Sequence, residues 1–262
     1  MDAQLNGIDA VFLDLDGTIY LGGNLIDGAL DFLKRCDERG IKRYFLSNNS
    51  SRSVKQYVEK LHGFGIPAVE EDVLLSTHDL LAWLASNTIT KTWLIGTEGM
   101  REMLEDSGIE TRSEEPEYVV LGYDTEINYE KLSKASVFLH AGVPLVASHP
   151  DMVCPSPDGG LPDVGAYLAL LKTTTGIDPI HITGKPNAGM ILHKIDALGL
   201  DPARCAMVGD RLYTDLAMAT RAGCVGILVL SGEATIDDVS KLEEGAEQQP
   251  TIIVNSVGEL LR

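Results

Sequence analysis

Two aspartates lie two residues apart at the end of an apolar run. The stretch VFLDLDGTIY begins as a buried β-strand and then places Asp14 and Asp16 where the pattern should stay apolar. With a side-chain period of two, both carboxylates point to the same side of the strand. Like charges in a low-dielectric site repel unless a cation, a shared proton or solvent relieves them. A strand-to-turn junction with solvated aspartates is the structural alternative, since Gly17 permits a sharp turn.

Three further groups of polar residues follow predicted strands. In FLSNNSSRS, the hydroxyl of Ser47 and the backbone amides after it could receive phosphate oxygens before the next helix begins. In HITGKPNAGM, Lys185 could act as a point charge for a phosphate, and MVGDRLYTDLAMA supplies Asp210 and Asp215. Each group alone has an ordinary reading, because Ser and Asn commonly cap helices and lysines commonly lie on the surface.

We expect these groups to meet at one edge of the predicted sheet, and that edge suggests a function for them. In open α/β sheets, ligands bind in the crevice beyond the carboxyl ends of the strands. Four acids converging there are costly for a structural design, and a hard divalent cation with oxygen ligands relieves the repulsion. Magnesium fits best, because it is held by a few carboxylates and also binds substrate phosphate.

The elements that position these residues alternate along the chain. Helical segments such as GALDFLKRCDERG, SVKQYVEKLHGFG and GMILHKIDALGL lie between strand-like apolar runs. This alternation predicts an α/β fold with parallel strands and crossover helices. The predicted strands cover residues 10–15, 41–47, 72–76, 92–96, 117–123, 144–149, 180–184, 205–210, 226–231 and 251–256.

The amino-acid composition favours a globular protein and argues against several other classes. The 262 residues are 44% hydrophobic, which allows a sizeable core, and no apolar run approaches the roughly 20 residues that span a bilayer. The N-terminus lacks the basic and apolar regions of a signal peptide, and the four cysteines lack metal-type spacing, so we expect a cytoplasmic protein. A net charge of −18 without clustered Lys and Arg argues against nucleic acid as a partner.

The middle third of the chain is predicted to form a second domain. Residues 79–180 contain 6 Lys and Arg against 16 Asp and Glu, together with their own alternation of strands and helices. We therefore expect a discontinuous core domain of residues 1–79 and 181–262 and an inserted α/β domain of residues 80–180.

Together the four motifs resemble the haloacid dehalogenase (HAD) superfamily. DLDGT matches its DxDGT motif, LSNN its hydroxyl motif, GKP carries its lysine, and GDRLYTD is the GDxxxTD form of its acidic motif. About 138 residues separate Ser47 from Lys185, which is similar to the subclass with a cap between the second and third motifs. The stretches DGTIYLGG, VVLGYDTEINYEKL and ASHPD resemble the NagD-like branch, subfamily IIA, which includes p-nitrophenyl phosphatases. This resemblance implies a HAD-like Rossmannoid core of parallel strands with a C2-type α/β cap.

The resemblance also implies a role for each motif residue. Asp14 would be the nucleophile that forms an aspartyl-phosphate, and Asp16 the general acid and then the general base. Mg²⁺ would be held by the Asp14 carboxylate, the Asp16 backbone carbonyl and the Asp210 carboxylate, with Asp215 and Thr18 supporting these ligands. The phosphoryl oxygens would be held by Ser47, Asn48, Asn49 and Lys185, of which Ser47 and Lys185 complete the catalytic set with the two aspartates.

The cap would select the substrate. We expect the leaving group to contact Tyr123, Asp124, His149 and Asp163, with Asp151, Pro162 and Gly165 nearby. Two residues depart from the usual pattern of the branch: Ser47 stands where Thr is common, and His149 stands where Asn is common before Pro150. The first departure keeps the hydroxyl, and the second concerns the substrate more than the chemistry.

The function implied is a magnesium-dependent phosphatase of small phosphomonoesters, such as sugar phosphates or nucleoside monophosphates. A phosphoryl-transferring mutase is the enzymatic alternative, and a non-catalytic phosphate-binding regulator is an alternative from another class. The expected partner is a small-molecule phosphate monoester, with neither nucleic acid nor membrane. Because caps of this subclass often form dimer contacts, a homodimer through the cap is also expected.

Overall fold

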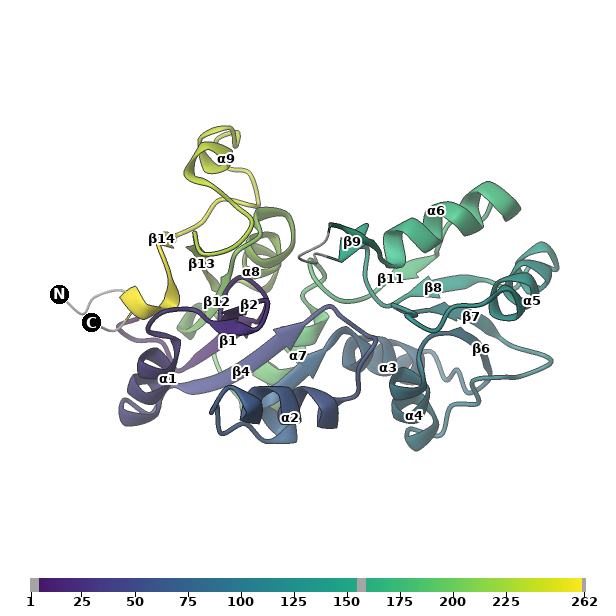
Figure 1. The fold of residues 1–262 in the computed structure, drawn as a ribbon, viewed down its shortest axis with the longest axis horizontal. Coiled ribbons are helices and arrows are strands. Elements are labelled where there is room, and N and C mark those ends of the chain that lie inside the picture. Colours follow the sequence, from purple (N-terminus) through teal and green to yellow (C-terminus); the bar gives the residue numbers. More distant parts are fainter. Residues whose placement is uncertain (1–4, 155–158, 261–262) are drawn as a thin grey trace. The chain divides into compact units, whose positions relative to one another are not determined.

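The computed structural model describes residues 5–154 and 159–260 (Figure 1). The chain divides into two compact units. The first consists of the chain up to Ser47, Val58–Leu74 and the chain from Lys185 onward, and the second of Asn48–Tyr57 and Leu75–Gly184.

The first unit is built on a sheet to which six strands contribute within the described residues. Its strand order is β14-β13-β12-β1-β4-β5, and β1 pairs in parallel with both β12 and β4. A two-stranded antiparallel hairpin, β2 and β3, follows β1. The strands are β1 Ala10–Asp14, β2 Tyr20–Leu21, β3 Asn24–Leu25, β4 Lys42–Ser47, β5 Val73–Leu75, β12 Cys205–Gly209, β13 Val225–Val229 and β14 Ile252–Val254.

Apolar side chains hold this sheet against its helices. Every residue of β1 is buried, as expected for a central parallel strand covered on both faces. Ala10 and Phe12 pack in one cluster with Ile191 and Ile195 of α7 and with Met218 of α8. Burying a side chain such as Phe12 contributes about 1.5–3 kcal/mol. The helices are α1 Ala29–Glu38, α2 Val54–Gly63, α7 Gly189–Leu198, α8 Ala217–Ala222 and α9 Ile236–Ser240, with 3₁₀ turns at Glu70–Asp72, Pro202–Arg204 and Val257–Glu259 and a π-helical turn at Leu212–Leu216.

The second unit is built on a sheet of order β11-β8-β7-β6, with parallel pairing throughout these strands. A short antiparallel pair, β9 and β10, precedes its last helix. The strands are β6 Thr92–Ile95, β7 Tyr118–Leu121, β8 Leu145–Ala147, β9 Val153–Cys154, β10 Leu161–Pro162 and β11 His181–Ile182, and the helices are α3 Ser76–Ser86, α4 Glu98–Asp106, α5 Tyr129–His140 and α6 Val164–Thr175.

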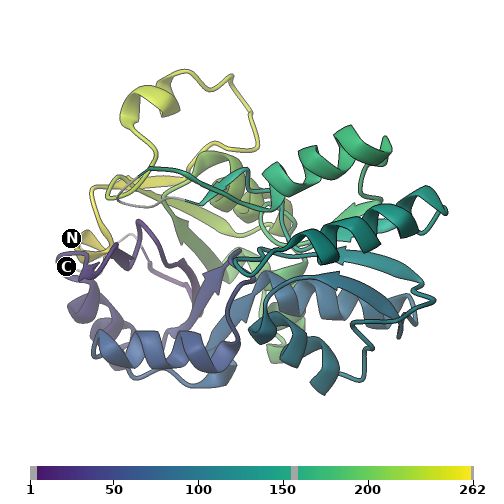
Figure 2. The same ribbon diagram turned by 45° about the vertical axis from the view of Figure 1, so that its right-hand side comes forward.

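The two faces of the second sheet bury alternate residues of each strand. Val119 and Leu121 of β7 pack in a cluster with residues of α5 and α6. Val120 packs in a separate cluster with residues of α3 and α4. Helices α5 and α6 accordingly lie side by side on one face of the sheet in both views (Figures 1 and 2). The period of two in the sequence thus sets which helices each side chain meets.

The sequence predicted much of this architecture. A strand overlaps each of the ten predicted strand ranges, and the three quoted helical segments form α1, α2 and α7. Parallel pairing in both sheets confirms the predicted α/β class. The two short hairpins were not predicted, because strands of two residues carry no periodic signal.

The observed division of the chain differs from the expected boundaries at residues 79 and 180. It falls after Leu74 and after Gly184, and the segment Asn48–Tyr57 groups with the second unit instead of the first. Gly184 belongs there because its amide donates a hydrogen bond to Asp79 Oδ2 at 2.9 Å. Asn48 belongs there because its backbone oxygen accepts a 2.6 Å bond from Ser76 Oγ.

Within the described part of the chain, no helix has the length and apolarity needed to cross a membrane. The four cysteines are all free, with Cys36 and Cys205 buried.

Candidate active site

Three aspartates of the first unit meet in a buried cluster. Asp14 ends β1 and Asp210 directly follows β12, which lies beside β1 with Leu13 opposite Val208. Asp215 lies in the π-helical turn Leu212–Leu216, a rare form that is frequent at functional sites. A carboxylate oxygen from each of these three aspartates lies within 4.8 Å of the other two. All three residues are at most 8% exposed.

One lysine lies within this cluster. Lys185 Nζ donates hydrogen bonds to Asp14 Oδ1 and, at 2.7 Å, to Asp215 Oδ1. The lysine is 3% exposed, so these are ion pairs shielded from water. One ammonium against three carboxylates leaves an excess of negative charge if all four groups are ionised.

Burial is the largest influence on the pKa values of Asp14 and Asp210 in this cluster. Burial raises the pKa of Asp14 well above its usual value, against the opposing effect of Lys185, while Asp215 and Asp210 raise it further. Burial, together with the charge of Asp215, raises the pKa of Asp210 to about 6. For Lys185, burial alone would lower the pKa, but Asp14 and Asp215 raise it above its usual value. The cluster therefore holds carboxylates that are costly to ionise without further positive charge.

The residues present fit a divalent cation. Among the described residues, Asp210 Oδ1 is buried and makes no hydrogen bond, while Asp210 Oδ2 accepts a 2.7 Å bond from the Glu233 amide. An unsatisfied buried carboxylate oxygen calls for an explanation such as an ion. The donors are all oxygens, the type that Mg²⁺ and Ca²⁺ prefer.

Glycines shape the space around these carboxylates. A Cβ on Gly17, whose φ is +88°, would lie 2.4 Å from Asp210 Oδ2, and one on Gly232 would lie 2.0 Å from the same atom. A Cβ on Gly209 would lie 2.3 Å from Asp215 Oδ2. No side chain larger than hydrogen fits at these positions unless the aspartates move.

Asp16 and Thr18 lie in the turn between β1 and β2. Asp16 is exposed, and its Oδ2 accepts a long 3.4 Å bond from the Tyr20 hydroxyl. The Gly17 amide donates to the Tyr20 carbonyl at 2.8 Å, which closes the turn. Thr18 is fully buried, and its hydroxyl makes no hydrogen bond to any described residue. The Asp16 carboxylate therefore stands apart from the buried cluster and is accessible to water.

Ser47 and the two asparagines after it fall in different units. Ser47 ends β4 in the first unit and is buried. In the second unit, Asn49 Oδ1 accepts bonds from the amide and hydroxyl of Ser51, at 2.9 and 2.6 Å, which is an Asx turn. The residue that caps α2 is Ser53, whose hydroxyl accepts from the Gln56 amide at 3.5 Å. Asn48 and Asn49 are thus not the caps of α2.

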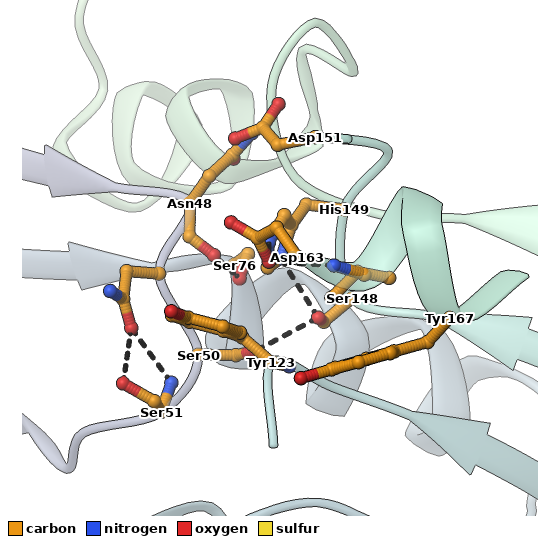
Figure 3. A network of polar contacts seen from close by, with 12 residues as sticks. Asn48, Ser50, Ser51, Ser76, Tyr123, Ser148, His149, Asp151, Asp163 and Tyr167 are labelled. Carbon is orange, nitrogen blue, oxygen red and sulfur yellow. Dashed lines mark hydrogen bonds and ion pairs between the residues drawn. The ribbon is translucent and has the colours of Figure 1, made fainter. Parts of the chain in front are cut away.

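The four residues expected to contact the leaving group are buried in the second unit (Figure 3 shows Tyr123, His149 and Asp163). Asp124 accepts a 2.8 Å bond from Lys131 Nζ. His149 is fully buried, and Asp163 caps α6 by accepting from the Val164 amide at 2.7 Å. Burial also raises the pKa of the Tyr123 hydroxyl. As substrate contacts these residues stay predictions, since the contacts described above are with the protein.

Several polar partners of these residues were missed from the sequence. Ser50, Ser76, Ser148 and Lys131 hold buried groups of the second unit. Only Lys131 carried a signal, because it lies on the helix that follows Asp124. The serines pair across 28 to 98 residues of sequence, which one sequence does not show.

Comparisons with known proteins agree with the motifs. Residues 11–110 match the family model of haloacid dehalogenase-like hydrolases, and residues 182–260 match the HAD-hydrolase-like model. The chain is 33% identical to the 5'-nucleotidase YutF of Bacillus subtilis over 252 residues, which cover 94% of this chain and 95% of that protein.

Two solved structures show the same architecture. The 4-nitrophenylphosphatase of Thermotoga maritima has a TM-score of 0.93 at 36% identity, covering 98% of this chain and 97% of that one. A glycerol phosphate phosphatase of Mycobacterium tuberculosis in complex with magnesium has a TM-score of 0.91 at 28% identity, covering 100% and 79%. The chain therefore belongs to the haloacid dehalogenase-like hydrolases, in the branch that contains NagD and the p-nitrophenyl phosphatases.

Proposed function

We propose that this chain is a magnesium-dependent phosphatase that hydrolyses small phosphomonoesters through an aspartyl-phosphate. The observation that carries the proposal is the buried cluster of Asp14, Asp210 and Asp215 with Lys185 bonded to two of its members. The names of the relatives, which are phosphatases and a nucleotidase, support the same chemistry.

Asp14 is the nucleophile of this mechanism. Its carboxylate oxygen forms a bond to phosphorus while the bond from phosphorus to the ester oxygen breaks. Lys185 holds the Asp14 side chain in place, favours its ionised form and adds positive charge beside the phosphoryl oxygens. The hydroxyl of Ser47 and the amides of Asn48 and Asn49 bind the remaining phosphoryl oxygens.

Asp16 moves the protons. It gives its proton to the leaving alkoxide in the first half-reaction, and in the second it takes a proton from the water that attacks phosphorus. The bond from Asp14 to phosphorus then breaks and releases inorganic phosphate. The exposure of Asp16 supports this role, since the group must reach both the leaving alkoxide and the attacking water. Such proton transfer contributes about 10²- to 10⁴-fold.

Mg²⁺ would be held by the carboxylates of Asp14 and Asp210 and the backbone carbonyl of Asp16, with Asp215 and Thr18 supporting these ligands. When bound, the cation supplies the positive charge that the three carboxylates lack and offsets the charge of the phosphoryl group. The unpartnered Asp210 Oδ1 is the atom that most favours this assignment.

The substrate is proposed to be a compact monophosphate. The relatives named above act on nucleotides, 4-nitrophenyl phosphate and glycerol phosphate. The excess of acidic residues between positions 79 and 180 disfavours substrates with several further anionic groups. A panel of phosphorylated metabolites ranked by kcat/KM would identify the class.

The direct test is release of phosphate from 4-nitrophenyl phosphate with Mg²⁺. The parent should be active and should lose activity with a chelator, and Asp14→Asn should lose at least about a thousandfold in kcat, since it removes the nucleophile. Asp31→Asn, an exposed aspartate of α1, is the matched control and should act like the parent. Full activity in Asp14→Asn would refute the mechanism. Transfer of phosphate to a second sugar in preference to water would favour the mutase alternative.

A cytoplasmic location and a homodimer through the cap stay predictions from the sequence and the resemblance. Cell fractionation and light scattering would test them.

A further inference from the structure

The loop after Ser47 is held by the second unit. The first unit's strand β4 ends at Ser47, and the next residues, the loop Asn48–Ser53 and the first turn of α2, group with the second unit. This loop includes Asn48 and Asn49, whose amides the proposed function assigns to phosphate. Whatever fixes the loop therefore fixes part of the proposed phosphate site.

A continuous chain of buried polar contacts reaches this loop (Figure 3). The Tyr123 amide donates to Ser50 Oγ at 2.8 Å, and Ser50 Oγ lies 2.9 Å from Ser148 Oγ. Ser148 Oγ lies 2.9 Å from His149 Nδ1, and His149 Nε2 lies 3.0 Å from Asp163 Oδ1. We name the four side chains, Ser50, Ser148, His149 and Asp163, the serine-histidine relay.

The hydrogen bonds of this relay can run in one direction. A carboxylate at Asp163 only accepts, so neutral His149 donates from Nε2 and accepts at Nδ1. Ser148 then donates to His149 and accepts from Ser50, and Ser50 accepts from the Tyr123 amide. Each hydroxyl donates once and accepts once, so loss of one member leaves a neighbouring group without its partner.

The relay is closed to solvent. Ser50, Ser148 and His149 are fully buried, and Asp163 is 5% exposed. Buried polar networks that satisfy all of their members fix a single arrangement, because water cannot replace a lost partner. Both ring nitrogens of His149 have partners inside this network, which favours a role through the loop over direct contact with substrate.

The same short segment contacts the loop a second time. Asp151, two residues after His149, accepts a 3.2 Å bond from Asn48 Nδ2. Ser76 Oγ donates to the Asn48 carbonyl at 2.6 Å, and Thr97 Oγ1 donates to the Ser51 carbonyl at 2.8 Å. The loop backbone is thus fixed at Asn48, Ser50 and Ser51 by residues of the second unit.

We infer that Ser148, His149 and Asp163 are positioning residues that set phosphate affinity through Ser50, without touching the substrate. The inference rests on the proposed function, in which the amides after Ser47 bind phosphoryl oxygens. Asp163 orients His149, His149 orients Ser148, and Ser148 holds Ser50 and with it the backbone that follows Ser47.

Ser148→Ala tests the relay at its centre. It removes one hydroxyl and leaves the Asp163 cap of α6 in place. Hydrogen exchange should show faster exchange of the amides of residues 49–53, and calorimetry with Mg²⁺ should show inorganic phosphate bound about ten- to a hundredfold more weakly, as expected when a binding group is misplaced. The affinity for Mg²⁺ itself should not change. Ser148→Thr, which keeps the hydroxyl, should recover most of the phosphate affinity.

The matched control is Ser133→Ala, which removes a serine hydroxyl of α5 bonded to the Glu130 carbonyl at 3.1 Å. It should leave both loop exchange and phosphate affinity at the parent's values. Should Ser148→Ala fail to fold, Ser148→Cys keeps the volume with a weaker donor and should show the same changes at smaller size. Phosphate affinity equal to that of Ser133→Ala, with or without faster loop exchange, would overturn the inference.

The outcome is separable from that of the proposed function. Hydrogen exchange and phosphate binding need no turnover, so they report on the relay even if the parent hydrolyses no ester. A parent that binds phosphate without hydrolysis, and loses that binding in Ser148→Ala, would refute the phosphatase and support the positioning role.

Discussion

Two clusters of ionisable side chains, one in each unit, offer the same number of potential metal ligands. The core cluster consists of Asp14, Asp210 and Asp215, and the cap cluster of His149, Asp151 and Asp163, each set with ligand atoms within 4.8 Å of one another. Their partners differ. In the core cluster, one lysine serves two of the three carboxylates and Asp210 Oδ1 has no partner among the described residues.

In the cap cluster, some of the ligand-type atoms bond to one another. His149 and Asp163 bond each other, Asp163 also caps α6, and Asp151 Oδ2 accepts from Asn48. Asp151 Oδ1 is nevertheless buried without a hydrogen bond to any described residue, as Asp210 Oδ1 is. The comparison teaches that proximity of ligand-type atoms does not by itself identify a metal site. What separates the clusters is burial. All three core carboxylates are buried, so their charge costs stability unless something binds it, whereas Asp151 of the cap cluster is partly exposed to water.

The largest effect on this contrast is expected from removing Lys185, the lysine that pairs with two carboxylates of the core cluster. Lys185→Ala leaves Asp14 and Asp215 buried without their cation, which should lower the free energy of unfolding of the metal-free protein by about 3–5 kcal/mol in urea. Lys241→Ala, which breaks a 3.1 Å exposed pair with Asp238, should lower it by about 1 kcal/mol or less. Equal losses in the two variants would show that the core carboxylates do not depend on Lys185.

A smaller effect is expected from filling the space beside Asp210. Gly232→Ala would place a Cβ 2.0 Å from Asp210 Oδ2, so the carboxylate must move. We expect a loss of about 1–3 kcal/mol from overpacking and loss of the stabilisation that Mg²⁺ gives, measured as the shift in Tm with added Mg²⁺. At Gly63, the last residue of α2, a Cβ meets open space, and Gly63→Ala should keep the full Mg²⁺ effect. A full Mg²⁺ effect in Gly232→Ala would contradict the proposed role of Asp210.

The charge of Asp210 gives a pH dependence with a definite sign. Its pKa of about 6 in the folded protein lies above the usual value of 3.8, so the folded state binds more protons than the unfolded state between these pH values. The stability contributed by this group is therefore present at low pH and is lost as the pH rises through 6. Asp210→Asn should be more stable than the metal-free parent by about 3 kcal/mol at pH 7, with the difference shrinking to roughly half of that at pH 5.

Denaturation by urea at pH 5 and pH 7, with and without Mg²⁺, measures this difference. Added Mg²⁺ should stabilise the parent and not Asp210→Asn. A metal-free parent that is as stable as Asp210→Asn at both pH values would show that Asp210 is not strained by burial.

The core cluster was predictable from the sequence and the cap cluster was not. Asp14 ends β1 and Asp210 follows the neighbouring parallel strand β12, and the carboxyl ends of parallel strands meet at one edge, so local pattern and one rule of topology bring these two together. Asp215 follows because its spacing from Asp210 is short. Lys185 does not follow from this rule, because the strand before it, β11, belongs to the sheet of the second unit.

In the cap, position along the chain does not show which residues bond to one another. Asp124 and His149 each follow a strand, and their contact with the substrate stays a prediction. Within the protein, Asp124 is paired with Lys131, and His149 with Ser148 and Asp163. The partners of Ser50 lie 73 and 98 residues away, so the segment Asn48–Tyr57 could not be assigned to the second unit from its own sequence. Side-chain hydrogen bonds between distant segments have no sequence period that would reveal them.

The smallest expected effect is a loss of stability on changing the cap cluster. This loss should not depend on Mg²⁺. Asp163→Asn keeps a side-chain oxygen that can cap α6 and accept from His149, but it removes the charge that strengthens both bonds. We expect the free energy of unfolding to fall by about 0.5–1.5 kcal/mol, because a charge-assisted hydrogen bond becomes a neutral one. Since Asp151 is partly exposed to water and we propose no cation at the cap cluster, the loss should be equal with and without Mg²⁺, measured by the same urea titration. A loss that Mg²⁺ changed would mean that the cap cluster binds the ion, and the contrast between the two clusters would fail.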